Sequence, residues 1–110
     1  MSLDINTATR EQGMLVRVAG EVDVSNAPEL REALDAALTS LADRCARHLE
    51  VDISEVSYID STGIGVLVGT VHRAEEHDVK VCVTRPQRNV ARVLGLLGLT
   101  EELGVNGEQD

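Results

Sequence analysis

The stretch VDISEVSYIDSTGIG, residues Val51–Gly65, decides the fold, because it runs from a strand pattern through a polar turn into a helix pattern. Apolar and polar residues alternate over Leu49–Ser54, which predicts a strand with one buried face. After Ser61 the period becomes helical. The residues of that apolar stripe are Ile64, Leu67, Val68 and Val71. A helix N-terminus has unpaired N–H groups and a partial positive charge, so Ser61 stands where a phosphate is tolerated and can act as a switch.

Strands and helices alternate on both sides of this stretch. Residues 3–7 and Met14–Ala19 are expected to be strands, the second ended by Gly20. The sequence Asn26–Glu29 offers a helix cap, with a proline in the first turn and an acidic residue three positions beyond the cap. A helix is expected to follow over roughly residues 27–42, because leucine and alanine recur there at steps of three and four.

The second half of the chain continues the pattern. The helix that begins near Thr62 is expected to end at residues 77–78, and residues 79–83 alternate as a further strand. The chain is then broken at Arg85 and Pro86. A last helical stripe ends at Gly98 and comprises Val90, Val93, Leu94 and Leu97. The tail, residues 106–110, is expected to be frayed.

This order of elements predicts a single α/β domain over residues 1–110. The expected architecture is a mixed, mostly parallel sheet of about four strands, packed with about three helices. In such sheets, the loops that follow the carboxyl ends of the strands carry the functional sites. The loop Val22–Asn26 and the turn Tyr58–Gly63 both follow strand ends, so we expect Asp23 and Ser61 to be neighbours.

Composition limits the classes of function. The only aromatic residue is Tyr58, which argues against a broad aromatic cofactor platform. Nineteen acidic and ten basic residues give a net charge of −9, which disfavours nucleic acid and anionic membrane surfaces as partners. No membrane span or secretory signal is visible, so a cytoplasmic location is expected. The cysteines, Cys45 and Cys82, are expected to be reduced packing residues.

Patterns of nucleophilic catalysis are missing. A serine hydrolase would have Gly-x-Ser-x-Gly, but Ile59 stands two positions before Ser61. His72 lies 11 residues along the same predicted helix, which separates it from Ser61 by about 16 Å and prevents it from acting as the base. We expect His48 and His77 at the surface.

Nucleotide and metal sites are not indicated either. A P-loop needs a Gly-Lys pair, whereas the only lysine is Lys80, on a predicted strand. The Gly-x-Gly of Gly63 and Gly65 is too short for a dinucleotide fingerprint, and close backbone packing is expected at both. The histidines and cysteines do not have the spacing of metal ligands, so no metal and no cofactor are expected.

Two carboxylates are the best site candidates. Asp52 is expected on a strand face, away from the loops, which leaves Asp23 and Asp60. A purely structural interpretation is also open, in which Asp60 and Thr62 cap the helix and Ser61 is a turn hydroxyl.

Four segments together have the pattern of a known family: Gly20–Asp23, Val51–Ser54, Ile59–Leu67 and Leu94–Leu99. The block Asp-Ser-Thr-Gly-x-Gly, in its strand-to-helix setting, is the most specific of these features. Through these segments, nearly the whole chain resembles the STAS-domain anti-sigma factor antagonists of bacterial partner-switching systems.

The resemblance implies a regulatory binding protein and not an enzyme. In such systems the unmodified antagonist captures an anti-sigma factor, a serine kinase with a histidine-kinase-like ATP-binding fold, and so frees a sigma factor. The kinase phosphorylates the antagonist, by implication on Ser61, which ends the complex, and a metal-dependent serine phosphatase restores the binding form. By the same resemblance, Asp23 and Asp60 help to dock the kinase, while Thr62 and Gly63 shape the contact surface.

The resemblance also leaves alternatives open. STAS-type domains occur with membrane transporters and lipid-transport complexes, where the serine need not be modified, so an accessory domain of this kind is the alternative function. Family members commonly continue past the Gly-Leu segment into another short strand and a final helix, whereas this sequence stops soon after Val105. A smaller sheet edge or helix layer is therefore expected. The oligomeric state is not predicted.

Overall fold

The computed structural model describes residues 2–107. Its elements, in chain order, are β1 (Asp4–Thr9), β2 (Gly13–Val22), α1 (Ala27–Arg44), β3 (His48–Ile59), α2 (Ser61–Glu75), β4 (Lys80–Thr84) and α3 (Arg88–Leu96). The strands form one sheet in the order β1-β2-β3-β4, in which β1 is antiparallel to β2 and the other neighbours are parallel. The predicted α/β fold, with a mixed and mostly parallel sheet, is confirmed.

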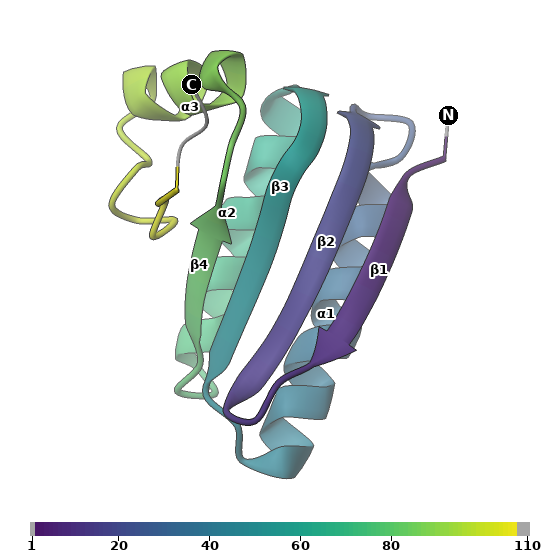
Figure 1. Cartoon of the computed structure of the whole chain (residues 1–110), viewed down its shortest axis with the longest axis vertical. Coiled ribbons are helices and arrows are strands. Elements are labelled where there is room, and N and C mark those ends of the chain that lie inside the picture. The colour runs from purple at the N-terminus through teal and green to yellow at the C-terminus, as the bar shows by residue number, and fades with distance from the viewer. Residues whose placement is uncertain (1, 108–110) are drawn as a thin grey trace.

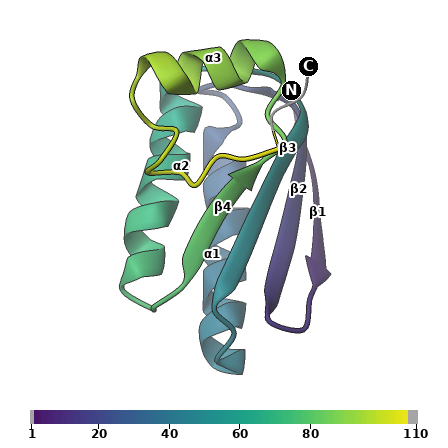
Figure 2. The same cartoon turned by 60° about the vertical axis from the view of Figure 1, so that its left-hand side comes forward.

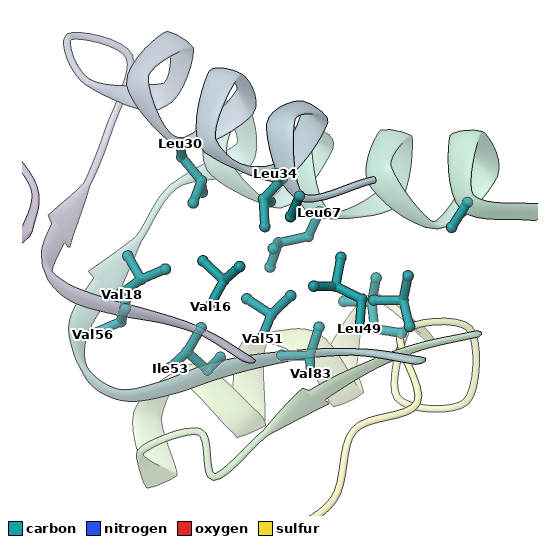
Figure 3. Packing of buried hydrophobic residues seen from close by; sticks show 14 of the residues in the cluster. Val16, Val18, Leu30, Leu34, Leu49, Val51, Ile53, Val56, Leu67 and Val83 are labelled. Carbon is teal, nitrogen blue, oxygen red and sulfur yellow. The ribbon is translucent and has the colours of Figure 1, made fainter. Parts of the chain in front are cut away.

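The core lies between the sheet and two helices. Helices α1 and α2 pack on the same face of the sheet (Figure 1). On that face, Val16 of β2 lies opposite Val51 of β3, which lies opposite Val83 of β4. Leucines of the two helices fill the space above these valines (Figure 3), among them Leu30, Leu34 and Leu67. Each such buried side chain stabilises the fold by about 1.5–3 kcal/mol, so the core holds α2 firmly against the strands.

Strand β2 is longer than predicted because Gly20 does not end it. Gly20 has a φ of 122° and stands beside a shift in the register between β2 and β3. Glycine adopts this backbone conformation without steric conflict, so the strand bulges there and continues to Val22. Strand β3 is also longer than predicted and reaches Ile59, which pairs with Val22. Both strands therefore finish at one edge of the sheet.

Helix α1 begins where the sequence predicts, but the predicted cap is not formed. Asn26 is the N-cap residue, yet its side chain makes no capping hydrogen bond. The Glu29 carboxylate instead accepts a hydrogen bond of 2.9 Å from the backbone N–H of Leu3. At the other end, Cys45 terminates the helix with a φ of 57° and is exposed, so its predicted packing role is wrong. Cys82 is partly buried, and both thiols are free.

Helix α3 lies across the end of the sheet at which β3 and β4 finish (Figure 2). Its buried residues are Val90, Ala91 and Leu94, whereas Val93 and Leu97 are 40% and 56% exposed, contrary to the predicted stripe. Residues 90, 91 and 94 share one face of a helix that turns about 100° per residue, and residue 93 lies to the side of that face. Leu97 follows the last residue of the helix.

The segment after α3 covers part of the outer edge of β4. The N–H of Val83 donates to the carbonyl oxygen of Leu103 at 3.0 Å, and Asn106 forms a parallel bridge with Thr84. Leu103 is fully buried in the core. The tail that was expected to be frayed is thus paired at Asn106, and residues 108–110 lie outside the described part of the chain.

His48 and His77 lie at the surface, as predicted, and His72 is exposed as well. Among residues 2–107, no helix combines the length and apolar character that a membrane crossing requires.

Candidate functional site at the ends of β2 and β3

The candidate site is built where β2 and β3 end together. The backbone N–H of Asp60 donates to the carbonyl oxygen of Val22 at 3.1 Å, immediately after the pairing of Val22 with Ile59. The residue that follows Val22 is Asp23, so the loop between β2 and α1 and the first turn of α2 start side by side. The structure thereby brings the two predicted site segments to the same edge of the sheet.

The first turn of α2 presents two hydroxyl groups to solvent. Asp60 is the N-cap residue, and its Oδ1 accepts a hydrogen bond of 3.0 Å from the backbone N–H of Gly63. Ser61 is the first residue of the helix, and both Ser61 and Thr62 are exposed. The predicted capping role of Asp60 is therefore present, and Ser61 is open to solvent.

Gly63 fixes the position of this turn. A Cβ atom at Gly63 would lie 2.6 Å from Cγ1 of Val22 and 2.8 Å from Cγ1 of Ile59, closer than real contacts allow. The predicted close packing is confirmed at Gly63 but is wrong at Gly65, where a Cβ atom would meet nothing within 4 Å. Ser61 is consequently held at a fixed place relative to both strand ends.

Asp23 is held in a tight local turn. Its Oδ1 accepts hydrogen bonds from the hydroxyl group of Ser25 and, at 2.9 Å, from the backbone N–H of Ser25. These hydrogen bonds hold the pKa of the Asp23 carboxyl below its ordinary value of 3.8, and the bond from the Ser25 hydroxyl contributes most. A negative charge at neutral pH therefore lies in the loop beside the first turn of α2.

Exposed apolar side chains accompany these polar groups. Val24 is 69% exposed in the loop after Asp23, and Tyr58 is 49% exposed two residues before Asp60. Large exposed apolar residues beside polar ones are common at protein interfaces. Sequence reasoning did not single out Val24, because nothing in the pattern distinguishes an exposed loop valine from a core one.

Asp52 stands apart from this site, as predicted. It lies in the middle of β3, is 2% exposed, and accepts a hydrogen bond of 3.2 Å from Nε of Arg17. Burial opposes its ionisation most strongly, but hydrogen bonds from Ser54 and from Arg17 together outweigh burial and lower the pKa of the Asp52 carboxyl. Arg85 approaches the same carboxylate at 3.9 Å. Asp52 thus forms ion pairs with two arginines, and its role is structural.

Within residues 2–107, no three histidine, cysteine or acidic side chains come together in a way that would hold a metal ion.

The sequence matches a known protein family. The model of the STAS domain family matches residues 4–108. The chain belongs to the STAS domain family. The resemblance inferred from the sequence is thereby confirmed.

A curated relative of this STAS domain protein is the anti-sigma-B factor antagonist of Staphylococcus aureus. The two are 34% identical over 106 residues, which cover 96% of this chain and 94% of the relative. A solved anti-sigma factor antagonist from Mycobacterium paratuberculosis has a TM-score of 0.81 at 22% identity, over 94% of this chain and 84% of that one. The phosphorylated form of the Bacillus cell fate determinant SpoIIAA has a TM-score of 0.70 at 16% identity, over 98% and 92%.

The fold is also shared with a different class of protein. The murine anion transporter Slc26a9 has a TM-score of 0.76 at 20% identity, but the match covers 93% of this chain and only 17% of the transporter. At this level of identity the likeness concerns the fold alone.

Proposed function

We propose that this STAS domain protein is an anti-sigma factor antagonist, a regulatory binding protein without catalytic activity of its own. The proposal depends on one observation above all. The exposed serine of the Asp-Ser-Thr-Gly-x-Gly block begins α2, in a chain that aligns over 94% of the length of a curated anti-sigma-B factor antagonist. The alignment supports the class of function, and the position of Ser61 supports the mechanism.

The proposed binding surface is the edge at which β2 and β3 end. Its members are Asp23, Asp60, Ser61, Thr62 and Gly63, flanked by Val24 and Tyr58. The two aspartates dock the partner and support phosphate transfer, and the exposed apolar side chains supply area that becomes buried on binding. The partner is an anti-sigma factor that is also a serine kinase with a histidine-kinase-like ATP-binding fold, and a serine phosphatase reverses the modification, all in the cytoplasm.

Phosphorylation of Ser61 switches binding off through charge. A phosphate adds about −1.5 to −2 charges at neutral pH, next to Asp60 and close to Asp23, on a protein whose net charge is already −9. Desolvating such a group in an interface is unfavourable unless it gains a cationic partner. In the free protein, the N-terminus of α2 partly offsets the added charge. The modification therefore disrupts the complex while the domain stays folded.

The test is a comparison of wild-type protein with Ser61→Asp in affinity capture from native lysate, read by mass spectrometry. We expect the wild-type chain to retain an ATP-binding serine kinase, and Ser61→Asp to retain about tenfold less. We expect the melting temperature of the variant to stay within about 4 °C of wild type, because no core contact changes.

Gln12→Glu is the matched control. It also adds one negative charge, but on the exposed turn before β2, at the opposite end of that strand from the site. Its capture should equal that of wild type. Equal retention of the kinase by Ser61→Asp, or a large drop in its melting temperature, would contradict the switch.

The alternative is an accessory domain of a membrane transporter or a lipid-transport complex. The match to part of Slc26a9 shows that this fold also occurs within an anion transporter. The near full-length match to a free-standing antagonist favours the first function. Capture of transporter subunits equally by wild type and Ser61→Asp would favour the alternative.

A further inference from the structure

Asn26 is a buried polar residue at the candidate site, and sequence reasoning treats it only as a helix cap. It is 4% exposed. Its side-chain oxygen accepts a hydrogen bond of 2.9 Å from the backbone N–H of Asp23, and its side-chain nitrogen donates one of 2.8 Å to the carbonyl oxygen of Glu21. One buried amide therefore joins the end of β2 to the loop that carries Asp23.

This arrangement differs from ordinary helix capping. An N-cap side chain normally accepts a hydrogen bond from a backbone N–H in the first turn of its helix, and Asn26 makes no such bond. Its side-chain oxygen instead accepts a hydrogen bond from the preceding loop, at Asp23. Helix α1 therefore has no side-chain cap from Asn26, whose side chain holds the loop in place instead.

The consequence is a fully braced Asp23. The N–H of Asp23 donates to Asn26, its carbonyl oxygen accepts from the N–H groups of Asn26 and Ala27 at 3.2 and 2.8 Å, and its Oδ1 accepts from Ser25. After the hydrogen bonds from Ser25, the backbone N–H of Asn26 also helps to lower the pKa of the Asp23 carboxyl. The Asp23 carboxylate is thus partly exposed and stands on a fixed backbone.

We propose that Asn26 is a positioning residue for the partner-binding edge. Its buried amide fixes the backbone over residues 21–26, and thereby aims the carboxylate of Asp23 at a lysine or arginine side chain of the partner protein. Val24 is held beside it as the apolar contact. The part of this inference that concerns the partner rests on the proposed function, whereas the bracing of the loop does not.

The bracing is tested without any partner, in Asn26→Ser. Serine is itself a good N-cap residue, so α1 keeps a competent start and the domain folds, but the hydrogen bond to Glu21 is lost. By NMR, we expect the amide of Asp23 to exchange with solvent about tenfold faster, and the pKa of the Asp23 carboxyl to rise toward its ordinary value as the turn with Ser25 opens.

Asn89→Ala is the control for this measurement. Asn89 also uses its side-chain nitrogen to bond a backbone carbonyl oxygen near the same end of the sheet, that of Ser57 at 2.9 Å. Its removal should leave the exchange and the titration of Asp23 unchanged. Unaltered exchange and pKa of Asp23 in Asn26→Ser would overturn the proposal.

The aiming of Asp23 is tested by a double-mutant cycle on the affinity for the captured kinase. Asp23→Asn removes the charge but retains a side-chain oxygen for Ser25. We expect Asn26→Ser alone to weaken binding about tenfold, and to have little further effect when Asp23→Asn is present, because the aimed charge is already gone. Additive losses would show that Asn26 does not act through Asp23. If no kinase is captured at all, the proposed function fails, while the NMR result still decides whether Asn26 braces the loop.

Discussion

Gly63 shows how a single residue determines the position of the switch. The side chains that a Cβ atom would strike, Val22 and Ile59, are buried, and they belong to the two strands whose ends form the site. Such side chains do not yield easily in a packed core. The absence of a side chain at Gly63 therefore allows the first turn of α2, with Ser61, to lie directly on the strand ends.

Gly63→Ala is expected to destabilise the protein by about 1–3 kcal/mol, because the added methyl group overpacks this contact. Gly65→Ala, two residues along the same helix, is the control. With open space at that position, it should be neutral or stabilise by up to about 1 kcal/mol, since alanine favours helix more than glycine does. Urea unfolding of the three proteins measures the difference, and equal stabilities of the two variants would refute the packing argument.

At the same scale, the sequence predicted which segments lie side by side but not how their side chains are held. Asp60 was predicted as a cap and is one. Asn26 and Glu29 were predicted as a capping pair, yet they bond the loop and the N-terminal segment. Polar side chains of these types can satisfy several backbone groups, and tertiary neighbours select among them. The alternation of the sequence contains no information about those neighbours.

At the scale of elements, the attachment of α3 depends on two side-chain amides. Strand β4 pairs with β3 only as far as Asp52, so the end of β3 lacks a neighbouring strand on that side. Two of its carbonyl oxygens are bonded by α3 and its cap instead. Gln87 donates to Ser54 at 3.0 Å, and Asn89 donates to Ser57 at 2.9 Å. Helix α3 thus takes the place of the missing strand partner.

Gln87→Ala is expected to loosen this attachment, at a loss of about 1 kcal/mol, because the hydrogen bond from Gln87 to the Ser54 carbonyl oxygen is lost. Amide hydrogen exchange should become faster in α3, at residues such as Val90 and Leu94, and stay unchanged in α1. Gln12→Ala, which alters an exposed glutamine before β2, provides the comparison. Unchanged exchange in α3 would mean that its buried apolar face alone holds the helix.

The elements themselves were largely predictable, because each has its own period. The order of strands and helices is the predicted one. Strand ends and helix faces were less predictable. Glycine commonly ends a strand, but Gly20 lies at a bulge within β2. The burial of residues in α3 depends on which side of this short helix meets the sheet. Both outcomes are decided by contacts between segments far apart in the sequence.

For the whole molecule, two electrostatic effects act in opposite directions as the pH falls. The net charge of −9 means that exposed carboxylates repel one another at neutral pH, and their protonation relieves this repulsion. Asp52 acts in the other direction. Its pKa is lowered in the folded protein, so its ionised form stabilises the fold above its ordinary pKa of 3.8, and this contribution is lost as the pH falls through the folded value.

Asp52→Asn isolates this contribution. At neutral pH the variant should be less stable than wild type, because Arg17 loses its charged partner in the sheet. The difference between the two proteins should shrink as the pH falls below 3.8, since protonation then removes the same charge from the wild type. Urea unfolding from pH 7 to pH 2 measures both curves. A difference that stays constant across this range would show that the Asp52 pair does not make the stability of the fold depend on pH, and that general charge repulsion governs the acid response.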